Sequence, residues 1–364
     1  MFSIHQKVRS LFSLCCDTIS ETTAVFSRLA EGGIIVADHS DFFSAEVFSD
    51  EGGFQTSNLY LYRGNSRSLL IDAGFNTDLS KQKTMMLLEQ CGVTPDKLDV
   101  FLTHNHPDHA GMAEFLHSMG ATIYAAPAEA STRALICRYY DEGPDSAVSI
   151  LRFYGFSEEE AGNIYRNTMK PVYGYHRYNM LDFPFLPVMP GAFFFDETYS
   201  LEVLSLSGHT AGSLGLADHN GRRLFTGDCI GGKDVFLISA TRYGDRLWER
   251  QQETLSRLKT YEEYCVFPGH GVPFSGMEEP IRNTKLYFEK LCRRILRSAD
   301  GEPRSVRNYL AAVFGYRPGR MTEEEGIRLH FRMANLLACL EWLTDHGELD
   351  LSMRDETAYW NRKS

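Results

Sequence analysis

The segment Thr103-His104-Asn105-His106-Pro107-Asp108-His109 decides how the rest of the chain is interpreted. It follows the apolar run 98–102, which predicts a short buried strand. Imidazole and carboxylate groups together suit zinc, iron or manganese. Residues two apart in an extended loop project to the same side, so His104 and His106 can bind one ion. Asp108 and His109 follow the turn at Pro107 and can face a second ion nearby.

Three further candidate ligands stand where a predicted strand gives way to a turn that contains glycine. They are His209 in the sequence SGHT, Asp228 in TGD and His270 in PGHG. Flanking glycines let the backbone turn sharply and bring a side chain close to an ion. Loops at strand ends are a common place for a binding site. A single histidine of this kind is more often structural, so the prediction depends on the combination of these segments, each closing a predicted strand.

These segments make the chain resemble the metallo-β-lactamase superfamily of metallohydrolases. The resemblance extends over about residues 34–275. It implies an α/β protein with the four-layer αββα fold, in which two sheets pack face to face between helices and a dinuclear site lies at one edge. The matching segments are NLY at 58–60, LIDAG at 70–74, THNHPDH at 103–109, GHTAGS at 208–213, TGD at 226–228 and PGHG at 268–271.

The resemblance also implies a role for each candidate ligand. The ligands of the first ion would be His104, His106 and His209. Those of the second would be Asp108, His109 and His270, with Asp228 as the bridge between the ions. Seven ligands for two ions leave positions for water, as a catalytic site requires. We therefore expect two divalent ions, with zinc as the first choice and iron or manganese as alternatives.

Two adjacent cations lower the pKa of a bridging water to about 7, which predicts an enzyme that hydrolyses bonds with a metal-bridging hydroxide. Asp108 is the predicted catalytic residue, because it can bind metal and also orient the hydroxide or accept a proton. Asp72 closes its strand near the same edge and is predicted either to accept an imidazole N–H or to serve as an ordinary turn residue. Weaker candidates for contacts behind the ligands are Thr103, Thr210 and Ser213. Cys229 is predicted to be a buried bystander.

The order of predicted elements divides the chain into a catalytic domain, 1–278, and a C-terminal domain, 279–364. Alternating strands and helices over the first 125 residues favour a layered α/β domain. Residues 126–199 hold 15 of the 42 Phe and Tyr residues and several prolines. We expect an insertion or lid there, although aromatic side chains more often pack a subsidiary core than contact a ligand.

The C-terminal domain is predicted to be winged-helix-like. Apolar periodicity indicates helices near 281–295, 306–314 and 322–347, followed by short strands at 349–351 and 357–360. This pattern resembles the appendage of the lactamase-β-2-like hydrolases. The resemblance implies that the domain packs on the catalytic domain and walls the substrate cleft.

Composition favours a small-molecule substrate over nucleic acid. The 37 Lys and Arg against 48 Asp and Glu give a net charge of −11, and binding to phosphates requires a basic surface. The aromatic-rich segment 126–199 also favours a small or acyl-bearing substrate. The first prediction is a small thioester, ester or lactone, which the resemblance to glyoxalase II and related enzymes implies. A phosphodiesterase or endoribonuclease is the second, and the nearest approach to a basic cluster is Arg293, Arg294, Arg297, Arg304 and Arg307. A third is a metal-binding regulator whose winged helix binds DNA.

Hydropathy and cysteine spacing indicate where the protein is located. The mean hydropathy is −0.28, and no apolar run reaches the ~20 residues of a membrane helix. The first 20 residues make a poor signal peptide. None of the eight cysteines forms a CxxC pair, so we expect reduced thiols in a cytoplasmic protein without membrane contact. A homodimer is left open.

Overall fold

Two six-stranded sheets form the centre of the protein. The computed structural model describes residues 41–48, 56–129, 144–167, 183–196, 199–239, 243–299, 301–319 and 322–363. The first sheet has the strand order β1 (Phe42–Phe48), β2 (Thr56–Tyr62), β3 (Ser68–Ile71), β4 (Leu98–Phe101), β5 (Thr122–Ala125) and β6 (Leu186–Pro187). The second has the order β12 (Phe274–Ser275), β11 (Cys265–Pro268), β10 (Arg223–Gly227), β9 (Leu214–Asp218), β8 (Tyr199–Ser205) and β7 (Gly191–Asp196).

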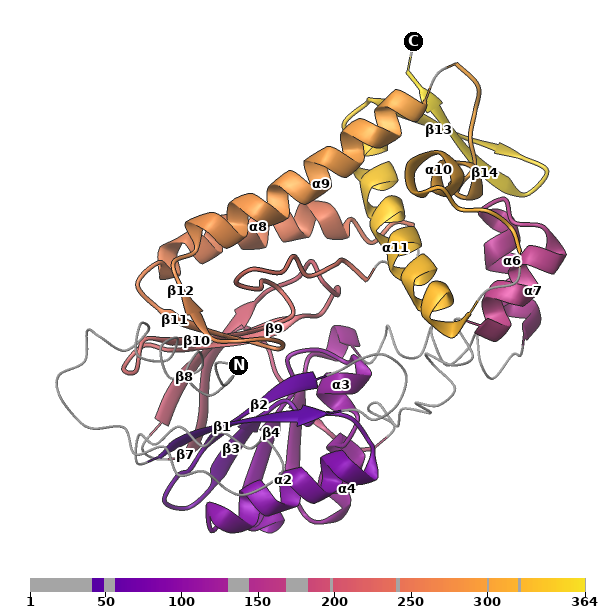
Figure 1. Cartoon of the computed structure of the whole chain (residues 1–364). Helices are drawn as coiled ribbons and strands as arrows, with labels where there is room; N and C mark the ends of the chain where they lie inside the picture. The colour runs from indigo at the N-terminus through magenta and orange to yellow at the C-terminus, as the bar shows by residue number, and fades with distance from the viewer. Residues whose placement is uncertain are drawn as a thin grey trace, which may run out of the picture.

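Helices cover the outer face of each sheet, which confirms the predicted αββα fold (Figure 1). Those of the first sheet are α2 (Asp78–Gln90), α3 (Pro107–Ala110) and α4 (Ala113–Ser118). Buried Leu87 and Leu116 pack with this sheet. The second sheet carries α8 (Leu247–Leu258) and the first part of α9 (Glu278–Ser298), whose Leu255 and Ile281 pack with it. Short 3-10 helices lie at Pro95–Lys97 and Lys259–Tyr261.

The core between the two sheets is rich in aromatic side chains. The ring of Phe42 from the first sheet lies 5.8 Å from Phe225 and 5.2 Å from Phe267 of the second. Tyr60 contacts the same two rings, at 5.3 and 5.4 Å. Such rings bury a large apolar area and pack in preferred edge-on geometries. This packing fixes the sheets against each other, so that loops leaving the ends of β4 and β10 meet at one edge.

The expected insertion at 126–199 is wrong for its last part, which belongs to the sheets. β6 pairs with β5, and β7 pairs with β8 as an edge strand. Phe193 of β7 lies in the core, 5.8 Å from Phe101. Consecutive phenylalanines at 193–195 hide the alternating pattern by which a half-buried strand is recognised. Residues 130–143 and 168–182 of the expected insertion lie outside the described residues.

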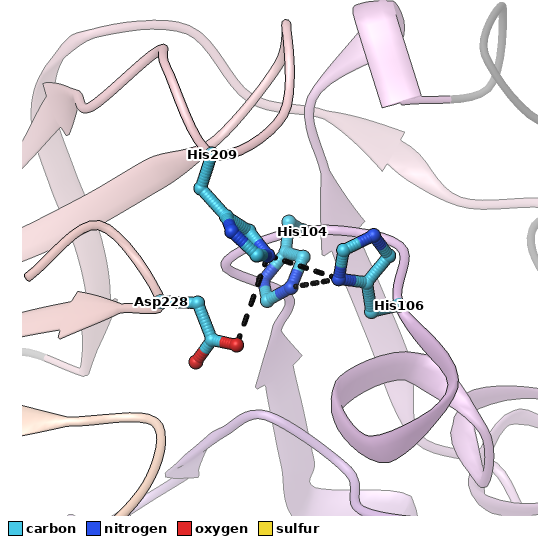
Figure 2. A group of neighbouring side chains, drawn as sticks. All are labelled: His104, His106, His209 and Asp228. Carbon is cyan, nitrogen blue, oxygen red and sulfur yellow. Dashed lines mark hydrogen bonds and ion pairs between the residues drawn. The ribbon is translucent and has the colours of Figure 1, made fainter. Parts of the chain in front are cut away.

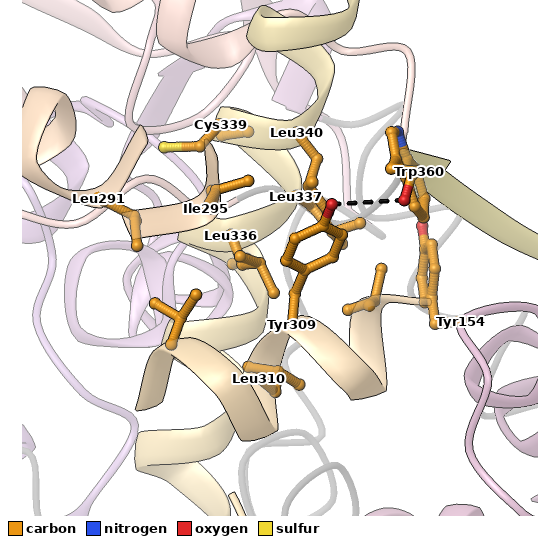
Figure 3. Packing of buried hydrophobic residues seen from close by; sticks show 14 of the residues in the cluster. Tyr154, Leu291, Ile295, Tyr309, Leu310, Leu336, Leu337, Cys339, Leu340 and Trp360 are labelled. Carbon is orange, nitrogen blue, oxygen red and sulfur yellow. Dashed lines mark hydrogen bonds between the residues drawn. The ribbon is translucent and has the colours of Figure 1, made fainter. Parts of the chain in front are cut away.

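The middle of that segment packs with the C-terminal region. Helices α6 (Pro144–Phe153) and α7 (Glu158–Ile164) share one core with α9, α10 (Val306–Phe314), α11 (Glu323–Asp345), β13 (Leu349–Arg354) and β14 (Thr357–Arg362). Figure 3 shows this core, which includes Tyr154 and Trp360 and in which the Tyr309 hydroxyl donates to the Trp360 carbonyl at 3.3 Å. The three helices and the hairpin predicted after residue 280 are present. The boundary at 278/279 and the winged-helix assignment stay predictions.

Replacing Leu151 tests whether this core is one cooperative unit. Leu151 of α6 is 1% exposed, and the change Leu151→Ala should lower the free energy of unfolding by about 2–5 kcal/mol. Amide hydrogen exchange should accelerate in α10 and α11 as well as in α6. The matched control is Leu286→Ala on α9, where the side chain is 38% exposed. Faster exchange confined to α6 and α7 would contradict a shared core.

Candidate metal centre

The structure brings all seven predicted ligands together in two adjacent groups. The first group is His104, His106, His209 and Asp228, and the second is Asp108, His109, Asp228 and His270. Within each group one ligand atom per residue lies within 4.8 Å of the others. Asp228 belongs to both groups, so the two share an edge. Each group could therefore hold one metal ion, with the Asp228 carboxylate between them.

The path of the backbone around Pro107 separates the two groups. His104 and His106 follow β4 in a loop, and their side chains turn into the first group. Pro107 then begins helix α3, a position at which the fixed φ of proline is favourable. Asp108 and His109 lie in the first turn of α3 and face the second group. The predicted turn at Pro107 thus distributes four neighbouring residues between two sites.

In the first group three imidazole nitrogens converge (Figure 2). His106 Nδ1 lies 3.0 Å from both His104 Nε2 and His209 Nε2. His209 Nε2 also lies 3.7 Å from Asp228 Oδ2. His104 and His209 are buried. Nitrogen lone pairs that meet in this way suit a cation at their centre.

Hydrogen bonds on the far side of the rings fix which nitrogen faces inward. His209 Nδ1 contacts the Leu237 carbonyl, and His270 Nδ1 contacts the Thr56 carbonyl at 2.5 Å. A carbonyl oxygen only accepts, so each Nδ1 carries a proton and donates it. The Nε2 atom of each ring is then the nitrogen that can bind a metal. The donor set therefore fits metal ligation on this geometric ground.

Asp72 orients two further ligands, in agreement with its predicted contact to an imidazole. Its Oδ2 accepts from His109 Nδ1 at 2.8 Å and from the Thr103 hydroxyl at 3.0 Å, and its Oδ1 accepts from Thr103 N at 2.8 Å. Because the Thr103 hydroxyl donates to Asp72, it accepts from His104 Nδ1 at 3.0 Å. Both rings thus present Nε2 inward. Asp72 has a φ of 63°, a strained value that the surrounding hydrogen bonds maintain.

The second group contains two carboxylates, whereas the first contains one. His270 Nε2 lies 3.0 Å from Asp108 Oδ2 and 3.2 Å from Asp228 Oδ2. His109 Nε2 lies 3.3 Å from Asp228 Oδ1. Among the described residues that Oδ1 atom is buried and has no hydrogen-bond partner. A buried carboxylate oxygen without a hydrogen bond is unfavourable unless a cation neutralises it, so this atom also fits a metal site.

The two groups differ in how they bind protons. Burial, reinforced by the neighbouring histidines, lowers the pKa of His104 well below its ordinary value and that of His106 to about 3. Burial acts in the same direction on His270, but the Asp228 and Asp108 carboxylates outweigh it and raise the pKa of His270 to about 11. Burial likewise opposes ionisation of Asp108, yet the adjacent histidines hold its pKa well below the ordinary value. Protons therefore occupy the second group when no metal is present.

Glu129 was missed by sequence reasoning, although it holds the two ligand loops together. It is 1% exposed. Its Oε2 accepts from Asn105 N at 3.1 Å, and its Oε1 accepts from the Thr210 hydroxyl at 2.8 Å and from Gly212 N at 2.7 Å. Asn105 stands between two ligands of the first group, and Thr210 follows a third. No local pattern marks Glu129, because its partners are distant in sequence.

The other predicted neighbours have supporting roles. The Ser213 hydroxyl accepts from Thr210 N at 3.1 Å, behind His209. Cys229 is buried, and burial raises the pKa of its thiol to about 12, so the thiol stays protonated. This agrees with its predicted role as a bystander. Asn58 donates to the Pro268 and Gly271 carbonyls at 3.0 and 2.8 Å, and thereby holds the turn that carries His270.

Comparison with known proteins identifies the family. The family model of the metallo-beta-lactamase superfamily matches residues 52–134 and 158–270. The chain belongs to this superfamily, and with the ligand geometry described above it is a metallohydrolase. Among the residues described, no helix is both long and apolar enough to cross a membrane.

Two solved structures show the same fold over most of the chain. A metallo-beta-lactamase family protein from Thermus thermophilus is 20% identical, with a TM-score of 0.68 over 89% of this chain and 99% of its own. A beta-lactamase domain protein from Burkholderia ambifaria is 17% identical, with a TM-score of 0.71 over 93% of this chain and 97% of its own. No curated protein sequence matches significantly.

The change Glu129→Gln tests the contacts between the ligand loops. An amide group places N–H donors where the carboxylate accepts, so at least one backbone or hydroxyl donor loses its partner. We expect the affinity for Zn²⁺, titrated against a chelating dye, to fall about 10- to 100-fold. Glu89→Gln on the exposed face of α2 is the matched control. Equal zinc affinity in both variants would show that Glu129 does not support the site.

Metal uptake should release protons. At pH 7 the imidazole of His270, with its pKa raised to about 11, is protonated in the metal-free protein, whereas a metal ligand must be neutral. Binding therefore expels at least one proton, and the apparent metal affinity should rise with pH. Calorimetric titration in buffers of different ionisation enthalpy measures this release. A binding enthalpy that is independent of the buffer would contradict the assigned protonation.

Proposed function

We propose that the protein is a hydrolase that works with two divalent metal ions. The observation that carries this proposal is the place of Asp228 in both ligand groups, with one carboxylate oxygen buried and lacking a hydrogen bond within the described residues. His104, His106 and His209 would hold one ion. Asp108, His109 and His270 would hold the other, with Asp228 as the bridge.

When bound, two such ions supply a hydroxide nucleophile near neutral pH and polarise the oxygen of the bond to be cleaved. The chain contributes the orientation of its ligands. His109 and His270 keep Asp108 ionised, so its carboxylate can bind metal and can also receive a proton. The His270 side chain is 26% exposed, whereas that of His109 is fully buried. We propose that substrate approaches from the side of His270.

Zinc is the metal we propose first. Imidazole nitrogen and carboxylate oxygen both suit zinc, and no sulfur is needed in the set. Iron and manganese accept the same ligands, so the metal supplied by the cell contributes to the choice. The bridging position holds Asp228, where class B β-lactamases typically have cysteine, and this disfavours an enzyme dedicated to antibiotics.

A small thioester, ester or lactone is the substrate class we propose. Cleavage of RNA, or binding of DNA by the C-terminal region, needs cations that are available to phosphates. Two of the five arginines considered for this purpose lie beside acidic side chains. Arg307 pairs with Glu160 at 3.0 Å, and Arg293 lies 3.7 Å from Glu289. We therefore propose a small-molecule substrate without nucleic acid, and a cytoplasmic location in keeping with the free cysteines at 91, 229, 265, 292 and 339.

Replacing Asp228 tests the dinuclear centre. Elemental analysis of the purified wild-type protein should find about two ions per chain. The change Asp228→Asn preserves shape but removes the bridging charge, so it should lower metal content to about one ion or fewer and hydrolysis by more than about 100-fold. Asp350→Asn on β13, where the side chain is exposed, is the control. Full activity with normal metal content in Asp228→Asn would rule out the bridge.

A substrate panel separates the three candidate functions. The metal-loaded protein should turn over at least one thioester, ester or lactone and should leave phosphodiesters and short RNA intact. Turnover of the RNA or phosphodiester alone would favour the nuclease. Retardation of DNA at moderate salt, with no turnover of any compound, would favour the regulator.

A further inference from the structure

The chain that leads from β10 to α8 contacts both the first ligand group and the C-terminal helix α11. Two residues of this connection, Leu237 and Ser239, touch the ligands. The Leu237 carbonyl accepts from His209 Nδ1, and the Ser239 hydroxyl lies 3.2 Å from His106 Nε2. Ser239 N also donates to the His209 carbonyl at 2.9 Å. The position of this short stretch therefore helps to set the orientation of two imidazole rings.

The residue between them, Ile238, is held from the opposite side. Its side chain is 1% exposed and lies in the C-terminal core. Both of its backbone groups bind the side-chain amide of Asn335 on α11. Ile238 N donates to Asn335 Oδ1 at 3.2 Å, and Asn335 Nδ2 donates to the Ile238 carbonyl at 3.3 Å. Asn335 thus pairs with Ile238 much as a neighbouring strand would.

Asn335 is an unusual residue for its surroundings. It has no exposed surface, and the residues that follow it, Leu336 and Leu337, lie in the apolar core. Burial of an amide in such a place is unfavourable unless its donors and acceptor are used. Here they are used, since Nδ2 also donates to the Phe331 carbonyl one turn earlier, at 2.6 Å. The amide supplies a donor and an acceptor side by side, which an apolar side chain or a carboxylate cannot do.

A second contact from α11 holds the far end of the same connection. Glu341 is 4% exposed, and its two carboxylate oxygens accept from Gly244 N at 2.7 Å and from Arg246 N at 2.8 Å. The Arg246 side chain also pairs with Asp345 at 2.9 Å. Helix α11 therefore binds this connection at two places, before and after residues 240–242.

We propose that Asn335 is a positioning residue for the first ligand group. Through Ile238 it fixes the Leu237 carbonyl and the Ser239 hydroxyl, and through these it orients His209 and His106. The C-terminal region is then a structural part of the metal centre. This inference rests on the proposed metal-dependent function. It predicts that α11 affects the ion in the first ligand group more than the ion in the second.

The test compares two substitutions in α11. Asn335→Leu keeps the side-chain size and the apolar surroundings but leaves both backbone groups of Ile238 without their partner. Leu340→Ala is the matched control, because Leu340 is fully buried in the same core but is not a hydrogen-bond partner of Ile238. Stepwise dissociation constants for Zn²⁺ and the absorption spectrum of the Co²⁺-loaded protein are measured for each, together with Tm.

We expect Asn335→Leu to weaken one of the two zinc constants about 10- to 100-fold and to alter the Co²⁺ spectrum. The other constant should change less than about threefold, and Leu340→Ala should lower Tm while leaving both constants near those of the wild type. An equal loss of zinc affinity at both sites, no loss at either site, or the same loss in Leu340→Ala would overturn the positioning role.

A second variant covers the case in which Asn335→Leu does not fold. Asn335→Asp has the same shape and still accepts from Ile238 N, but it cannot donate to the carbonyl. It should again weaken one constant selectively, and unchanged constants would overturn the inference. If the wild-type protein binds none of Zn²⁺, Fe²⁺ and Mn²⁺, the proposed function itself fails. If it binds two ions that respond equally to these substitutions, only the role of Asn335 fails.

Discussion

Two buried carboxylates, those of Asp108 and Asp228, converge on one imidazole nitrogen, and the rest of the structure depends on this concentration of negative charge. Their Oδ2 atoms lie 3.0 and 3.2 Å from His270 Nε2. Buried anions are stable only beside compensating positive charge. Protons on His109 and His270 supply that charge in the metal-free chain. Metal ions would supply it by displacing those protons, so the two carboxylates favour the binding of cations at this position.

Such a centre requires that each ligand side chain keeps one orientation. Hydrogen bonds from several parts of the fold maintain these orientations. Asp72, at the end of β3, fixes His109 and, through Thr103, His104. Glu129, after β5, joins the loops on either side of the first ligand group. The aromatic core between the sheets keeps these strand ends at one edge. Helix α11 reaches the same edge through the chain that follows β10.

Sequence reasoning found the seven side chains that converge in the structure, because their signal is local. Four of them fall within 104–109, and each of the others stands beside glycine at the end of a predicted strand. The order of most strands and helices was predictable as well, because apolar periodicity is also a local signal. Glu129 and Asn335 were missed because their partners are remote in sequence, so nothing near them signals a role. The strand at 191–196 was missed because consecutive aromatic residues conceal its alternation, and the core shared by α6, α7 and α11 joins segments far apart in the chain.

The central claim is that seven side chains form two adjacent metal sites that share Asp228. Anomalous X-ray diffraction from crystals of the metal-loaded protein, measured on both sides of the absorption edge of the bound metal, tests it directly. Two anomalous peaks are expected, one among His104, His106 and His209 and one among Asp108, His109 and His270, with the Asp228 carboxylate in contact with both. A single peak, or peaks away from these residues, would contradict the claim.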